Sequence, residues 1–207
     1  MKRLSYFHLL FMMSSLALLL GGCVTKPARV LTRHFVLVPA PAPEQASTTA
    51  QQSSVEVGFV KMPSYLLRDS MVVRKSADEV EYFETALWAE RLDHSFQQTL
   101  AQNLSMLLAS NQACLSASER DRLVVRVSVN VEQFDVDTEG RGTLLAAWRL
   151  SVVGTDTPMK IGQAHLTRPG PSPRGNPQAI ATTLSSLLAE FSRVLAQALR
   201  ESAKAGR

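Results

Sequence analysis

A run of alternating residues, 123–131, constrains the fold more than any other feature of the chain. Every second residue in it is leucine or valine, and Arg126, Ser128 and Asn130 lie between them. A period of two predicts a strand with one buried face and one face toward solvent. After Gln133 the apolar residues change parity, which predicts a bulge or sharp twist. The chain is therefore expected to form a sheet that is covered on one side.

Other segments of the sequence also have strand character. They are 34–38, 54–60, 71–74, 79–83, 144–153 and 160–166. The segment 39–54 is rich in proline, glutamine, serine and threonine, so we expect it to be a surface loop.

Two segments have the period of an amphipathic helix. The first begins at Leu92 and has Asn111 as its expected stop, while the second follows Asn176 as N-cap and Pro177 as first helical residue. Apolar residues line one face of the second helix over 180–199. Each half of the chain thus has strands followed by a helix. We predict an α+β fold, in which a largely antiparallel sheet has two long amphipathic helices on one face.

The N-terminal segment has the pattern of an export signal. Two basic residues precede an apolar run, 9–20, that only two serines interrupt. Twelve helical residues span about 18 Å, well short of the roughly 30 Å hydrocarbon core of a bilayer, so a stable transmembrane helix is the weaker interpretation. We predict a signal peptide over 1–22, a lipidated tether over 23–32 and a single domain over 33–203.

Cys23 ends a sequence that resembles the bacterial lipobox, because an apolar residue and two small ones, Leu20-Gly21-Gly22, precede it. Cleavage between Gly22 and Cys23 would leave a cysteine that accepts diacylglyceryl on its thiol and a third acyl chain on its amine. Stable anchoring needs more than one acyl chain, which this modification supplies. Val24 replaces the aspartate that commonly retains lipoproteins at the inner membrane, and this favours the outer membrane. The alternative is an ordinary secretory signal with an incidental cysteine.

Acylation of Cys23 would leave Cys114 without an intrachain partner. We interpret Cys114 as a small apolar filler beneath a loop rather than a reactive or intermolecular thiol.

The composition gives little support to nucleic-acid binding or catalysis. Without residues 1–22 the net charge falls from +4 to +2, and only 6% of the residues are aromatic. His34, His94 and His165 are far apart and lack metal-ligand spacing. The chain has no G-x-S-x-G or C-x-x-C motif, and its Gly-Arg-Gly at 140–142 lacks the rest of a phosphate-binding loop. We predict no catalytic residue, metal or cofactor.

Several short motifs together resemble one protein family. They are Tyr65-Leu66-Leu67-Arg68, a β-rich run ending at Arg74, Trp88-Ala89-Glu90-Arg91-Leu92 at the start of the first helix, and Trp148 in the second half. The chain resembles, from the lipobox to about Leu199, the auxiliary lipoproteins of ABC-type transport systems, which are the Pqi C-type components of MCE lipid-transport systems. The resemblance implies a non-catalytic outer-membrane lipoprotein that supports intermembrane lipid transport. Its expected partner is a periplasm-spanning MCE-domain protein with its membrane transport components, and self-association stays open.

The roles of the motif residues stay open between structure and partner binding. Trp88 and Tyr65 either face a partner or belong to the core, and we favour the core. Arg68 and Arg74 either pair with Glu79, Glu81 or Glu90 or belong to a solvated rim. The docking surface is expected elsewhere, at the loop 39–54 and at the polar strand face formed by residues 126, 128 and 130.

Two other functions stay open from the sequence. A periplasmic lipid-binding carrier needs an apolar cavity of several hundred Å³. An envelope hydrolase needs a spatial convergence of side chains that sequence spacing does not reveal.

Overall fold

The computed structural model describes residues 31–41, 54–108, 113–114, 124–155 and 157–205. Contacts divide the chain into the units Met1–Leu31 and Thr32–Arg207, and the second unit contains every helix and strand described here. Its elements in chain order are β1 (Arg33–Phe35), β2 (Ser54–Lys61), the short 3-10 helix η1 (Ser64–Leu66), β3 (Ser70–Arg74), β4 (Val80–Trp88), α2 (Leu92–Leu107), β5 (Ala113–Cys114), β6 (Val124–Asp137), β7 (Gly142–Val152), β8 (Pro158–Arg168) and α3 (Gln178–Ala205). The signal peptide, the cleavage site at Gly22 and the acylated Cys23 expected from the sequence lie outside the described residues.

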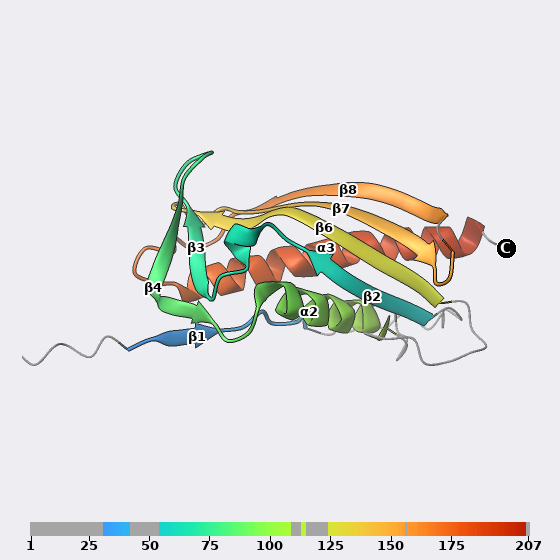
Figure 1. Cartoon of the computed structure of the whole chain (residues 1–207), viewed down its shortest axis with the longest axis horizontal. Helices are drawn as coiled ribbons and strands as arrows, with labels where there is room; N and C mark the ends of the chain where they lie inside the picture. Colours follow the sequence, from blue (N-terminus) through green and yellow to red (C-terminus); the bar gives the residue numbers. More distant parts are fainter. Residues whose placement is uncertain (1–30, 42–53, 109–112, 115–123, 156, 206–207) are drawn as a thin grey trace, which may run out of the picture. The chain divides into compact units, whose positions relative to one another are not determined.

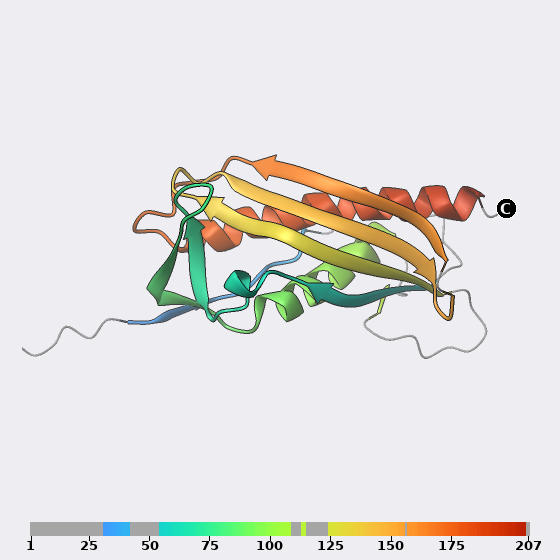
Figure 2. The same cartoon turned by 45° about the horizontal axis from the view of Figure 1, so that its top comes forward.

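Strand β6 is the central strand of an eight-stranded sheet in the described part of the chain (Figure 2). One edge of β6 pairs in parallel with β2 up to Asn130 and then with β3 at Val136 and Asp137. The other edge pairs antiparallel with β7, and β7 pairs antiparallel with β8. The two longest pairings are thus antiparallel, while both halves of the chain contribute neighbours to β6.

The α+β class is confirmed, and both long helices cover the same face of the sheet (Figure 1). Helix α2 packs against β2, and α3 packs across β6, β7 and β8. Helix α2 begins at Leu92 as expected but ends at Leu107, before the predicted stop at Asn111. Strand β4 continues to Trp88 instead of ending near residue 83, because its last residues pair with β1, and Leu87 also pairs with β3.

The predicted irregularity in the central strand is confirmed. The pairing of β6 with β7 shifts register between Val131 and Gln133. Val131 is buried before the shift and Phe134 after it, so the shift keeps the apolar side chains on the helix-covered face despite the change of parity.

Three aromatic rings join the two helices to the sheet. The Phe96 ring of α2 meets the Phe134 ring of β6 edge to face, with 5.1 Å between centroids, and lies 6.2 Å from the Phe191 ring of α3. All three side chains are fully buried. Helix α3 also approaches β7 closely, since a Cβ at Gly142 would lie 2.7 Å from side-chain atoms of Thr183 and Leu187. The core therefore lies between the sheet and both helices.

Among the described residues, one helix is long and apolar enough to cross a membrane, the stretch Gln178–Lys204 of α3. Most of that stretch is buried inside the protein, so its apolar face is explained by the core. The backbone of Cys114 lies in β5 beside Glu56 of β2, and its role as a small apolar filler stays a prediction.

Candidate functional site

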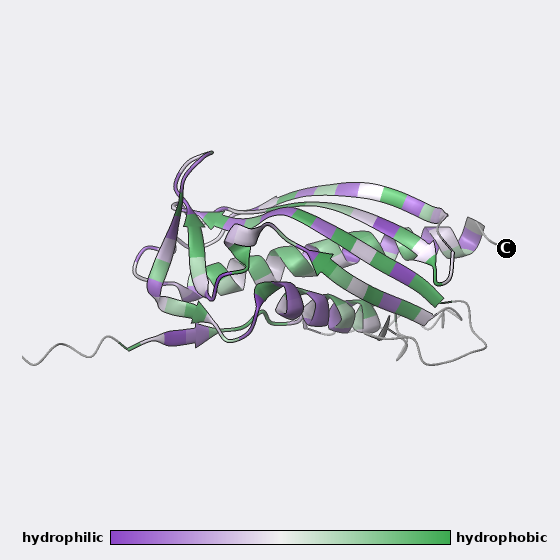
Figure 3. Cartoon of the chain, viewed as in Figure 1, coloured by the Kyte–Doolittle hydropathy of each residue, from purple (hydrophilic) through white to green (hydrophobic). Residues whose placement is uncertain are grey.

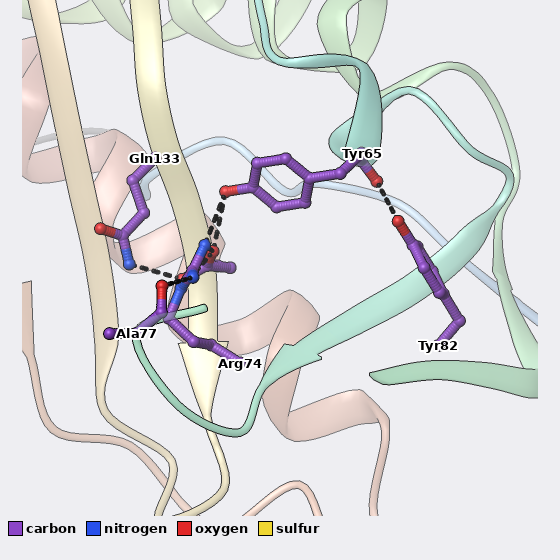
Figure 4. A network of polar contacts seen from close by, with 6 residues as sticks. Tyr65, Arg74, Ala77, Tyr82 and Gln133 are labelled. Atoms are coloured by element: carbon purple, nitrogen blue, oxygen red, sulfur yellow. Dashed lines mark hydrogen bonds and ion pairs between the residues drawn. The ribbon is translucent and has the colours of Figure 1, made fainter. Parts of the chain in front are cut away.

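Two of the motif residues, Tyr65 and Arg74, meet at Asp135 of β6 (Figure 4). Arg74 donates from Nη2 and Nε to Oδ2 of Asp135 at 2.7 and 3.0 Å, and the Tyr65 hydroxyl donates to the same oxygen at 2.9 Å. Gln133 Nε2 donates to Oδ1 at 2.8 Å. Asp135 is 1% exposed, and these donors satisfy both of its carboxylate oxygens.

Burial and the charge of Asp135 shift the pKa values of the two groups that donate to it, Tyr65 and Arg74. The pKa of the Tyr65 phenol is raised, mainly because burial disfavours the phenolate and also because the charge of Asp135 repels it. The pKa of the Arg74 guanidinium is raised, first by its hydrogen bond to Asp135. Tyr65 therefore stays a proton donor, and Arg74 stays charged at any physiological pH.

The cluster closes a gap between two strands that share one edge of β6. Strand β2 leaves β6 at Asn130, and β3 joins it at Val136. Tyr65 comes from η1, which lies on the connection between these two strands, and Arg74 comes from the end of β3. Hydrogen bonds from both residues to Asp135 hold this connection against β6, so the cluster has a structural role.

The partner of Arg74 differs from the glutamates considered from the sequence. Glu79 and Glu81 instead pair with Lys75 at 3.4 and 3.6 Å. Glu90 Oε2 lies 3.0 Å from Nδ1 of His94. The reason for the difference is the register of β3 with β6, which places Arg74 beside the second half of β6 and which local sequence cannot supply.

The remaining motif residues divide into core and surface. Leu66, Trp88, Leu92 and Trp148 are buried, with Trp88 only 6% exposed, so the core position favoured for Trp88 is confirmed. A Cβ at residue 162 would overlap the Trp148 ring, which explains the glycine opposite it.

Arg68, Ala89 and Glu90 lie nearer the surface. The Arg68 guanidinium lies 4.7 Å from the centroid of the Tyr82 ring. The Ala89 amide donates to the carbonyl of Phe35 at 2.8 Å, which extends the contact between β4 and β1. None of these contacts selects a ligand.

The uncovered face of the sheet and two residues of α2, His94 and Gln97, line a groove of about 1210 Å³. Arg126, Ser128 and Asn130 of β6, which we expected on a docking surface, all line it. Arg126 Nε lies 2.9 Å from Glu56 Oε1 across the parallel pairing with β2. Figure 3 shows polar and apolar residues alternating along these strands. Of the other expected docking surface, residues 42–53 lie outside the described residues.

Two large apolar side chains in the lining of this groove are exposed to solvent. Phe59 of β2 is 91% exposed and Ile161 of β8 is 66% exposed, and both line the groove. Strand β2 shifts register against β6 between Val57 and Val60, and such irregularities re-aim side chains. The alternating pattern of the β6 sequence indicated the polar row, whereas the outward direction of Phe59 depends on this local irregularity in β2. We take the groove as the candidate functional site.

The described part of the chain contains no group of three or more His, Cys, Asp and Glu residues that could hold a metal ion.

Comparison with known proteins identifies the family. The family model described as the ABC-type transport auxiliary lipoprotein component matches residues 35–196. The chain belongs to this family. Membership supports a lipoprotein of the cell envelope that is associated with an ABC-type transport system. It also agrees with the resemblance found in the motif residues.

Solved structures share the fold of this auxiliary lipoprotein. The crystal structure of an uncharacterised protein has a TM-score of 0.66 and 20% identity, covering 82% of this chain and 99% of that one. The crystal structure of a Xanthomonas campestris protein has a TM-score of 0.68 and 13% identity, covering 84% and 98%. At these identities the structures show the fold alone. No curated protein matches the chain.

Proposed function

We propose that this auxiliary lipoprotein is a non-catalytic docking component of an MCE-type lipid-transport system. Acylated Cys23 anchors it to the periplasmic leaflet of the outer membrane, and the tether 23–32 keeps the domain within about 30 Å of that leaflet. There the domain binds the end of a periplasm-spanning MCE-domain partner. Confinement to the membrane raises the effective concentration of the two proteins, so a contact of modest affinity suffices.

The exposed Phe59 in the uncovered groove is the observation that supports docking most directly. Aromatic side chains at the centre of an interface often supply much of its binding energy. Here Phe59 lines the same groove as Ile161 and the polar row at 126, 128 and 130, which is the mixture of apolar centre and polar surroundings found in protein interfaces. At 91% exposure the Phe59 ring is not enclosed, which favours a protein surface over a buried lipid chain as its partner.

Cys23→Ala is expected to abolish membrane anchoring. The variant lacks the thiol that accepts the diacylglyceryl group, so the acyl chains that hold the protein on the membrane cannot be attached. Membrane fractionation and intact-mass measurement of the purified protein test this. A Cys23→Ala protein that still has acyl chains and still fractionates with the outer membrane would contradict the anchoring proposal. Cys114→Ala is the matched control and should remain acylated.

A photo-crosslinking amino acid at position 59 or 161 is expected to capture the MCE-domain partner in living cells. Position 174, which is exposed and outside the groove, is the control. Mass spectrometry of the crosslinked product identifies the partner. Crosslinks only between copies of this chain would assign the groove to self-association. If no partner crosslinks form and the purified protein extracts phospholipid stoichiometrically, the protein is a lipid carrier and the docking proposal is wrong.

Phe59→Ser should weaken the same contact by roughly thirtyfold or more, the effect of losing an interface anchor worth about 2 kcal/mol. The fold should be unaffected, because an exposed side chain contributes within about 0.5 kcal/mol to stability. Leu31→Ser is the matched control, since Leu31 is an exposed apolar residue, at 81%, outside the groove. Co-purification with the partner that the crosslinks identify measures the loss of binding. Thermal unfolding of each variant measures its stability. Equal retention of the partner by Phe59→Ser and wild type would remove Phe59 from the interface.

A further inference from the structure

The residues that come after β1 form a strap along the helices. Its amides are fixed by helix side chains: Val38 donates to Ser185 Oγ of α3 at 3.0 Å, and Ala40 donates to Asn103 Oδ1 of α2 at 2.8 Å. Asn103 is buried and donates in turn to Ser192 Oγ at 3.1 Å. The strap, residues 36–41, therefore has a defined path across both helices, on the layer that covers the sheet (Figure 1).

A second groove, of about 570 Å³, lies between this strap and α3. Its strap side presents Val36 and Val38, which are 49% and 57% exposed, next to Phe35. Ala181 and Ala189 of α3 line its other side. The groove thus leaves branched apolar side chains in contact with solvent, in a segment whose backbone is held in place.

Two arginines line the same groove. Arg168 ends β8, Arg193 lies on α3, and neither forms an ion pair with any residue that the structure describes. A third cation is close, because the Arg33 guanidinium lies 5.1 Å from the centroid of the Phe35 ring. Guanidinium groups bind phosphate oxygens through paired N–H donors. The groove therefore combines an apolar surface with cations suited to phosphate.

The groove lies close in sequence to the expected lipid anchor at Cys23, which indicates the membrane as the source of a phosphate ligand. His34, which lines it, is eleven residues after Cys23. An extended chain of this length reaches at most about 40 Å, so an acylated Cys23 holds the groove near the lipid surface. The lipid source thus rests on the proposed anchoring through Cys23.

We propose that the groove between the strap and α3 binds the phosphate headgroup of an anionic phospholipid in the membrane that holds the anchor. Arg168 and Arg193 contact the phosphate, and the first methylenes of an acyl chain lie on Val36 and Val38. This contact turns the helix layer toward the membrane. The groove at Phe59 is lined by the uncovered face of the sheet together with His94 and Gln97 of α2, and it shares no lining residue with the groove at the strap, so it remains available to a protein partner.

The test uses the acylated full-length mature protein in phosphatidylcholine vesicles that contain phosphatidylglycerol with a diazirine near its headgroup. After irradiation, mass spectrometry should locate the lipid adducts on peptides from 34–41 and 178–193. Arg168→Gln and Arg193→Gln should each lower this labelling by roughly fivefold, the effect of removing one basic residue from an anionic membrane surface. Arg149→Gln, the same change at an exposed residue that lines the groove at Phe59 and not the groove at the strap, should leave the labelling unchanged.

Three further results decide the proposal. Even labelling over the domain, or labelling that both arginine variants retain, overturns it. Loss of labelling when inorganic phosphate is added assigns the groove to a free anion and overturns the lipid source. The intact mass of the same sample separates this proposal from the anchoring: a protein without acyl chains refutes both, and an acylated protein without labelling in the groove refutes only the headgroup site.

Discussion

Arg74→Gln is expected to lower the free energy of unfolding by about 3 kcal/mol, the low end of the range for breaking a buried ion pair. The variant leaves Asp135, which is 1% exposed, without its cation. Tyr65 and Gln133 still donate to the carboxylate, which keeps the loss from being larger. Urea unfolding followed by circular dichroism measures the change.

A double-mutant cycle separates the cost of leaving the Asp135 charge unpaired from the cost of lost packing. Asp135→Asn removes the buried charge and leaves Arg74, which is 23% exposed, with access to water, so its cost should be only about 1 to 2 kcal/mol. The double variant Arg74→Gln/Asp135→Asn should be more stable than Arg74→Gln alone, because no unpaired buried charge remains. If the two single losses simply add, the ion pair does not stabilise the connection between β2 and β3.

Leu104→Ala should cost about 2 to 5 kcal/mol, because it removes apolar atoms from a packed core and leaves a cavity. Leu104 lies on the buried face of α2 and is fully buried, in the same core as Phe96 and Phe191. The free energy of unfolding in urea gives the measurement.

Leu107→Ala is the matched control for this substitution, with the same chemical change on the same helix. Leu107 is only partly buried against the core, so less transfer free energy is lost. We expect a smaller cost than for Leu104→Ala. Equal costs, or a loss below about 0.5 kcal/mol for Leu104→Ala, would mean that α2 packs through a different face.

The candidate site was predicted from the sequence only in part. The row at Arg126, Ser128 and Asn130 follows from alternation along one strand, since side chains two residues apart share a face. Phe59 was not singled out, because it belongs to a short β-rich segment and its exposure depends on how β2 pairs with β6. Asp135 was also missed, although the parity change after Gln133 places it on the face opposite Phe134.

Local periodicity determined the elements of this protein, because the period of apolar residues reports which face each element buries. The helix start at Leu92, the bulge before Phe134 and the α+β class all follow from that period. Only the tertiary structure decided that β6 lies between strands of the first half on one edge and β7 on the other, and that Arg74 meets Asp135 and the strap meets α3. These contacts join residues 61 and 147 positions apart in the chain. Pairings over such separations depend on the packing of the whole core, which no local pattern encodes.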